Sequence, residues 1–180
     1  MTEKERYFAM LPTIRRILLA TDLSESARQA LRYAVAEAER HHASLTILHV
    51  VRDVVEMMSE ESGFDIEGHF DAATWSELNE KNTVRAKELA RAKVAEAAKE
   101  CVTGSPNCPA AHARIKIVMG DAAGRILEEL ADGAYDLVVM GAHGHNSFMD
   151  MLLGGVAQKV LRHSRTPVLF VRESVPTQGT

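Results

Sequence analysis

The stretch DLVVMGAHGHNSFMDMLLGGV, residues 136–156, decides how this chain is interpreted. Its opening DLVVM, residues 136–140, is mostly apolar and predicts a short buried strand. Glycines follow at positions 141, 144, 154 and 155, and they let the backbone turn tightly or approach a ligand closely. A helix expected over residues 155–163 would add unpaired N–H groups and a partial positive charge. The stretch therefore predicts a strand, a candidate phosphate loop and a helix in succession.

Two common phosphate-binding motifs are absent from the sequence. It contains no G-x-x-x-x-G-K-[ST], which excludes a Walker-type loop. It also contains no G-x-G-x-x-G after the first apolar run, so the dinucleotide fingerprint is missing. On spacing alone, Gly141 and Gly144 are as compatible with ordinary turns as with a ligand site.

Outside this stretch, short apolar runs alternate with amphipathic segments. The expected strands are residues 17–20, 44–51, 113–119, 136–140 and 167–171. The expected helices are residues 26–42, 75–102, 122–131 and 155–163, the second with an apolar face of Leu78, Leu89, Val94 and Ala98. This alternation predicts one α/β domain over residues 1–180, Rossmann-like, with a five-stranded parallel sheet and helices on both faces. Ligands of such sheets bind beyond the carboxyl ends of the strands, where the strand order reverses.

Residues 52–74 interrupt this regular pattern. They are acidic, contain two glycines and show no clear period. A long loop inside a compact domain is often functional, so we expect a lid, with an idle surface insertion as the equal alternative. Residues 174–180 are expected to form a flexible tail.

The composition limits the classes of function. With 21 basic and 25 acidic residues, the net charge of −4 argues against a broad nucleic-acid surface. No apolar run approaches the length that crosses a bilayer, and the first ten residues do not look like a signal peptide. Cys101 and Cys108 are too few for a disulfide framework. We therefore expect a cytoplasmic protein with no nucleic-acid or membrane partner.

The spacing of the glycines resembles that of the universal stress protein family. Its nucleotide-binding members carry G-x2-G, nine residues and then G-[ST], and here Gly141-x2-Gly144 is followed by nine residues and Gly154. The resemblance extends from ILLATDLSESARQAL, residues 17–31, to TPVLFVRE, residues 166–173. It implies a five-stranded parallel sheet with the strand order 3-2-1-4-5.

The resemblance also implies where an adenine nucleotide would bind. Asp22, with Thr21 beside it, would lie near the nucleotide, and the backbone of Val50 would contact the adenine. Met140 and Gly141 would lie near the ribose. The phosphates would meet the loop and the following helix start, at His143, Gly144, His145, Gly154, Gly155 and Val156.

One position departs from the family's motif. Gly155 stands where the nucleotide-binding members have serine or threonine. A hydroxyl there would donate to a phosphate oxygen, and losing a bond of roughly 1.5–3 kcal/mol would lower the affinity about tenfold or more. The backbone N–H of Gly155 is retained.

Several of these residues also have simpler interpretations. Asp22 could cap the following helix, since aspartate is a common cap. His143 and His145 could be solvated loop residues, and Asp121 and Asp150 fit helix caps better than metal ligands. Ser147 has no G-x-S-x-G elbow around it. The sequence therefore assigns no catalytic residue and no metal ligand.

The leading functional expectation is a stress-response regulatory protein that binds ATP, with AMP or ADP as alternatives, together with Mg²⁺ or Mn²⁺. Binding would alter a surface for an unidentified protein partner. The resemblance implies a homodimer formed through residues 167–171, and an apolar edge strand is costly to leave exposed. The alternatives are a dimeric interaction protein that binds no nucleotide and, less favoured, a slow ATPase.

Overall fold

The structure is a computed structural model that describes residues 11–51, 72–100, 108–132, 134–144 and 153–172. Residues 52–71 of the predicted lid, the tail over residues 174–180 and His145 lie outside the described residues. The described elements, in chain order, are β1 (Arg16–Thr21), α2 (Glu25–His41), β2 (Ser44–Val51), α4 (Ala72–Glu100), η2 (Pro109–His112), β3 (Arg114–Met119), α5 (Ala122–Ala131), β4 (Leu137–Gly141), α6 (Gly155–His163) and β5 (Val168–Val171).

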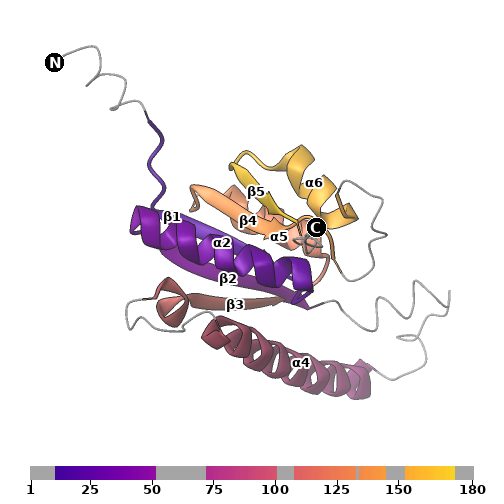
Figure 1. The fold of residues 1–180 in the computed structure, drawn as a ribbon. Coiled ribbons are helices and arrows are strands. Elements are labelled where there is room, and N and C mark those ends of the chain that lie inside the picture. The colour runs from indigo at the N-terminus through magenta and orange to yellow at the C-terminus, as the bar shows by residue number, and fades with distance from the viewer. Residues whose placement is uncertain (1–10, 52–71, 101–107, 133, 145–152, 173–180) are drawn as a thin grey trace, which may run out of the picture.

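The strands form a five-stranded parallel sheet in the order β3-β2-β1-β4-β5 (Figure 1). This confirms the predicted fold class and strand order. The order reverses between the central strand β1 and its neighbour β4, which pair with Ala20 opposite Met140. The next residues of both strands therefore reach the carboxyl edge of the sheet side by side, which is where ligands of doubly wound folds bind.

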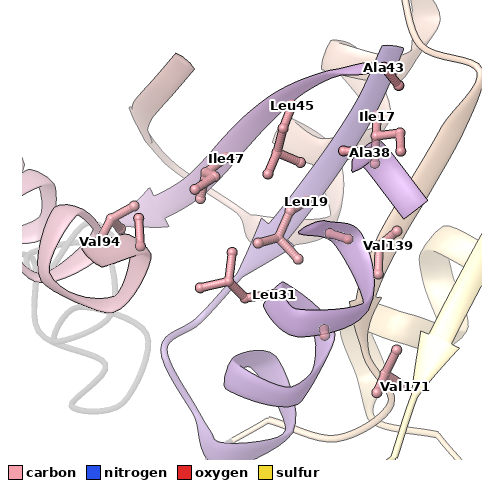
Figure 2. Close-up of a cluster of buried hydrophobic side chains, with 13 residues drawn as sticks. Ile17, Leu19, Leu31, Ala38, Ala43, Leu45, Ile47, Val94, Val139 and Val171 are labelled. Atoms are coloured by element: carbon pink, nitrogen blue, oxygen red, sulfur yellow. The ribbon is translucent and has the colours of Figure 1, made fainter. Parts of the chain in front are cut away.

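Helices cover both faces of the sheet, as predicted. Along β1, Ile17 and Leu19 point toward α2 and α4, whereas Leu18 and Ala20 point toward α5 and α6. Figure 2 shows the first cluster, in which Val94 of α4 joins the strand residues. Successive strand side chains alternate between faces, so a sheet covered on both sides needs nearly continuous apolar strands.

Helix α2 begins where a polar side chain caps it. Ser24 is the N-cap, and its Oγ accepts a hydrogen bond of 3.2 Å from the N–H of Ala27. The buried face of the helix presents Ala30, Ala34 and Ala38. These small side chains allow α2 to lie close to the sheet.

Helix α4 corrects two details of the prediction. It begins at Ala72 rather than at residue 75, so residues 72–74 are helical. Its buried stripe is Ala90, Val94 and Ala98, spaced four residues apart as one side of a helix requires. Leu89 does not belong to this face: it is 58% exposed, because it lies one position outside the stripe.

Candidate functional site

A cavity of about 500 Å³ lies at the carboxyl edge of the sheet, on the face covered by α5 and α6. It contains every residue that the sequence predicted for the site, apart from His145, which lies outside the described residues. These residues are Thr21, Asp22, Val50, Met140, Gly141, His143, Gly144, Gly154, Gly155 and Val156. Four separate segments of the chain thus converge on one hollow at the point where the strand order reverses.

Asp22 lies directly after β1 and is not the cap of α2. Its Oδ1 accepts hydrogen bonds from the N–H and the Oγ of Ser24, at 3.0 Å and 2.6 Å. Ser24 itself is the cap, so the capping alternative for Asp22 is wrong. The bonds from Ser24 hold the carboxylate at the end of the strand, where it lines the cavity.

The residue after Asp22 has an unusual backbone conformation. Leu23 has a φ of 66°, in the left-handed region that non-glycine residues rarely adopt. Its N–H donates to Oγ1 of Thr21 at 3.1 Å, and its side chain packs against the buried cluster between the sheet, α2 and α4. A left-handed leucine costs of order 1 kcal/mol or more and persists only where its surroundings enforce it. This turn therefore fixes the direction in which the Asp22 carboxylate leaves the strand.

Gly141 and Gly144 stand where no side chain would fit. A Cβ atom on Gly141 would lie 2.5 Å from Oγ of Ser26 and 3.1 Å from the backbone nitrogen of Ala27. A Cβ atom on Gly144 would lie 2.7 Å from Oδ2 of Asp22. The first glycine lets β4 pass the start of α2, and the second brings the loop against the Asp22 carboxylate.

Ala142 holds the two ends of the loop together. Its N–H donates to the carbonyl of Val171 at 2.8 Å, and its own carbonyl accepts from the N–H of Gly154 at 2.8 Å. Ser26 adds a third connection, because its buried hydroxyl donates to the same Val171 carbonyl at 3.2 Å. These bonds place Gly144 and Gly154 on the same cavity although nine residues separate them.

Helix α6 begins in the cavity wall without a side-chain cap. Gly154 is its N-cap and supplies no side-chain acceptor for the first N–H groups. Among the described residues, no atom lies within 4 Å of where a Cβ atom on Gly155 would stand, so none of them fills the space beside this helix start. Uncapped N–H groups that face open space are suited to an anionic ligand.

Sequence reasoning missed several residues that line the same cavity: Leu48, Asp121, Ile126, Ala142 and Lys159. Ala142 lies between two glycines of the motif, and this position in the sequence could have indicated that it belongs to the site. The other residues come from elements whose packing against the loop no local pattern revealed. The buried side chains of Leu48 and Ile126 add an apolar wall.

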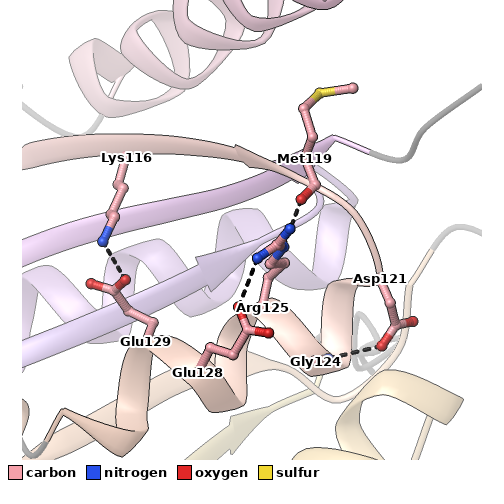
Figure 3. A network of polar contacts seen from close by, with 7 residues as sticks. All are labelled: Lys116, Met119, Asp121, Gly124, Arg125, Glu128 and Glu129. Atoms are coloured by element: carbon pink, nitrogen blue, oxygen red, sulfur yellow. Dashed lines mark hydrogen bonds and ion pairs between the residues drawn. The ribbon is translucent and has the colours of Figure 1, made fainter.

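Asp121 performs the capping role that the sequence suggested. Its Oδ2 accepts from the N–H of Gly124 at 2.8 Å, which caps α5 (Figure 3). Close by, Nε of Arg125 donates to the carbonyl of Met119 at 2.7 Å and ties the end of β3 to α5. Asp121 also lines the cavity, so one residue both caps α5 and forms part of the cavity wall.

The charged groups around the cavity are mixed. Asp22 and Asp121 bring two carboxylates, and Lys159 brings one ammonium group. Among the described residues, no three His, Cys, Asp or Glu side chains gather into a metal site. The arrangement suits a ligand that meets backbone N–H groups at one end and apolar side chains at the other.

A second cavity, of about 630 Å³, lies on the opposite face between α2 and α4. It shares Asp22 with the first cavity and is lined further by Arg28, His49, Leu89 and Lys93. Among the described residues that line it, there is no glycine and no helix N-cap. It therefore lacks the backbone donors that distinguish the cavity after β4.

Within the described ranges, no helix combines the length and the apolar character needed to cross a membrane.

The fold and the cavity define a Rossmann-like α/β protein with a glycine loop at its topological switch point. The model of the universal stress protein family matches residues 13–172. The chain therefore belongs to the universal stress protein family.

Relatives and solved structures agree with this assignment. The universal stress protein YxiE of Bacillus subtilis is 32% identical over 158 residues, covering 87% of this chain and 98% of YxiE. The solved structure of MJ0577, a universal stress protein of Methanocaldococcus jannaschii, gives a TM-score of 0.67 at 26% identity and covers 91% of this chain and 99% of that one. A universal stress protein solved in complex with cAMP matches the fold, with a TM-score of 0.58 at 20% identity, covering 90% of this chain and 99% of that one.

Proposed function

We propose that this chain binds an adenine nucleotide, with ATP as the favoured ligand and ADP or AMP as alternatives, and that it acts as a stress-response regulatory protein. The observation that carries the proposal is the cavity after β4, where the uncapped start of α6 and the glycine loop meet an apolar wall. That combination matches a ligand with phosphates at one end and a flat apolar base at the other. A family member solved with cAMP, itself an adenine nucleotide, adds support.

Each part of the nucleotide has a proposed contact. The phosphates would accept hydrogen bonds from the first N–H groups of α6, at Gly155 and Val156. The adenine would lie against Leu48 and Ile126, beside Val50. Asp22, held by Ser24, would accept from a ribose hydroxyl. Mg²⁺ or Mn²⁺ would join the site through the phosphate oxygens.

The regulatory part of the proposal rests on the connection between the loop and β5. Ala142 is bonded to the carbonyl of Val171, the last residue of β5. β5 is an edge of the sheet, and we propose that it pairs with β5 of a second copy through residues 167–171. A nucleotide that orders the loop would then act on the strand that forms the dimer. Sedimentation at twice the chain mass would support the dimer, and sedimentation at the single-chain mass would refute it.

One observation favours a second candidate function. Gly155 lacks the hydroxyl expected in nucleotide-binding relatives, so a dimeric interaction protein without nucleotide is the alternative. Mass spectrometry of the purified protein separates the two, because only the first predicts a co-purified adenine nucleotide. Phosphate release above a no-protein control would indicate slow ATP hydrolysis as an additional property.

Calorimetric titration of nucleotide-stripped protein with ATP and Mg²⁺ tests the proposal. We expect saturable binding by the parent and none by Gly144→Val, because the new side chain would occupy the space against Asp22. Leu89→Ala is the matched control, since Leu89 is exposed and lines the other cavity. Circular dichroism establishes that each variant is folded. A parent that binds no ATP at millimolar concentration refutes the proposal.

A further inference from the structure

We infer that Lys159 of α6 is a phosphate-binding residue that fixes the preference of the site for polyphosphate ligands and takes over the role of the hydroxyl missing at Gly155. This inference rests on the proposed function and goes beyond it, since the family motif ends before this position. Lys159 lies four residues after Gly155 and lines the same cavity.

The helix geometry directs Lys159 toward the open space beside Gly155. Residues four apart lie on the same side of an α-helix, and side chains lean toward its N-terminus. The lysine stem therefore extends back over the first turn of α6. Gly155 has no side chain, and among the described residues no atom lies within 4 Å of where its Cβ atom would stand, so none of them separates that position from the cavity.

The charges around the cavity make this lysine the natural partner of an anion. Among the described residues, the other charged side chains that line the cavity are the acidic Asp22 and Asp121, and both repel phosphate. Within the described residues, Lys159 forms no ion pair. Its ammonium group supplies the fixed positive charge that a phosphate chain needs beside these carboxylates.

This role has a consequence for specificity. An ammonium group gains more from a ligand with several phosphate charges than from one with a single phosphate, and nothing from a neutral nucleoside. The contribution of Lys159 should therefore fall in the order ATP, AMP, adenosine. The backbone N–H groups of α6 remain in every Lys159 variant. Their contribution to binding therefore stays constant, and any change in the order of affinities comes from Lys159.

Calorimetric titration of Lys159→Met tests the inference, with ATP and adenosine as the two probes. Methionine keeps most of the aliphatic stem and removes the charge. We expect the Kd for ATP to rise about tenfold or more, as for the loss of a charge-assisted hydrogen bond, while adenosine binding stays unchanged. Lys159→Arg should retain most of the ATP affinity.

Arg162→Met is the matched control, because it removes one positive charge from the exposed surface of the same helix and does not line the cavity. It should leave the Kd for ATP within about twofold of the parent, since Arg162 lies one helical turn farther from the cavity and an exposed charge outside the cavity is screened. A similar loss in Arg162→Met and Lys159→Met would show a general charge effect and overturn the inference.

The variant Gly155→Ser provides a second, independent readout. If its hydroxyl and the lysine serve the same phosphate, removing Lys159 should cost less ATP affinity in the Gly155→Ser background than in the parent. Equal ATP affinity of the parent and Lys159→Met overturns the inference and leaves nucleotide binding intact. A parent that binds neither ATP nor adenosine overturns the proposed function and this inference together.

Discussion

Gly141 shows how a single residue sets the geometry of the loop. The space that its Cβ would need is taken by Oγ of Ser26, at 2.5 Å, and by the backbone of the α2 start, at 3.1 Å. Contacts below 3.0 Å force a neighbour to shift, and the α2 start is anchored by its cap and by Val171. The glycine is therefore required by packing as well as by any ligand.

This packing gives a prediction that needs no ligand. Gly141→Ala should lower the free energy of unfolding by about 2 kcal/mol, as overpacking of a tight site does. Adding Ser26→Ala should recover part of this loss, because it removes the nearer of the clashing atoms. Urea denaturation of the two single variants and the double variant measures the coupling. Strictly additive losses would show that Ser26 is not what opposes the new methyl group.

At the scale of the elements, Asp136, which directly precedes β4, binds the backbone at the beginning of β1. Its Oδ2 accepts from the backbone N–H groups of Arg15 and Arg16, each at 2.9 Å. These two hydrogen bonds hold the pKa of the Asp136 carboxyl below its ordinary value, and the bond from Arg15 has the larger effect. Because the folded-state pKa is depressed, the stabilisation is present above the ordinary pKa of aspartate and is lost as the pH falls through the folded-state value.

Asp136→Asn should therefore have a pH-dependent effect on stability. At pH 7 we expect a loss of about 1 kcal/mol, typical of hydrogen bonds to a partly exposed carboxylate. The difference between parent and variant should shrink as the pH falls below the ordinary pKa of aspartate, about 4, toward the lower pKa of the folded state. Urea denaturation at several pH values between about 3 and 7 measures it. A difference that stays constant over this range would contradict the assigned role.

The two faces of α4 should contribute differently to the free energy of unfolding. Val94 is 1% exposed and packs into the core, whereas Leu89 is 58% exposed. Val94→Ala should cost about 2 kcal/mol of unfolding free energy, because it leaves a cavity. Leu89→Ala should stay within about 0.5 kcal/mol of the parent, as surface changes do. Thermal denaturation of both variants compares them directly, and a larger cost at Leu89 would mean that this side chain is covered.

At the scale of the whole molecule, the fold followed from the alternation of apolar runs and amphipathic segments. Ser44–Val51 and Ala122–Ala131 have the predicted bounds, because their apolar pattern ends at clear turn residues. The face of α4 was harder to predict, since alanine-rich helices offer several similar stripes. The pattern favours Leu89 as a core residue because leucine outweighs alanine in apolar character, yet in the structure Ala90 is buried and Leu89 is exposed.

The candidate site was predictable only where a local motif marked it. The glycines and Asp22 stand at strand ends that the pattern could locate. Ser26 and Lys159 carry no such mark, because a serine in a first helical turn and a lysine on a surface helix are common. Their positions against the loop depend on how α2 and α6 pack across the sheet, and the structure brings those contacts together.

The central claim is that ATP occupies the cavity after β4 rather than the larger one between α2 and α4. Backbone amide chemical shifts recorded during an ATP and Mg²⁺ titration of the nucleotide-stripped protein test it most directly. We expect saturable shifts at Ala142, Gly154 and Gly155, with Ala86 and Ala97 of the other cavity unchanged. Shifts confined to Ala86 and Ala97, or no shifts at millimolar ATP, would contradict it.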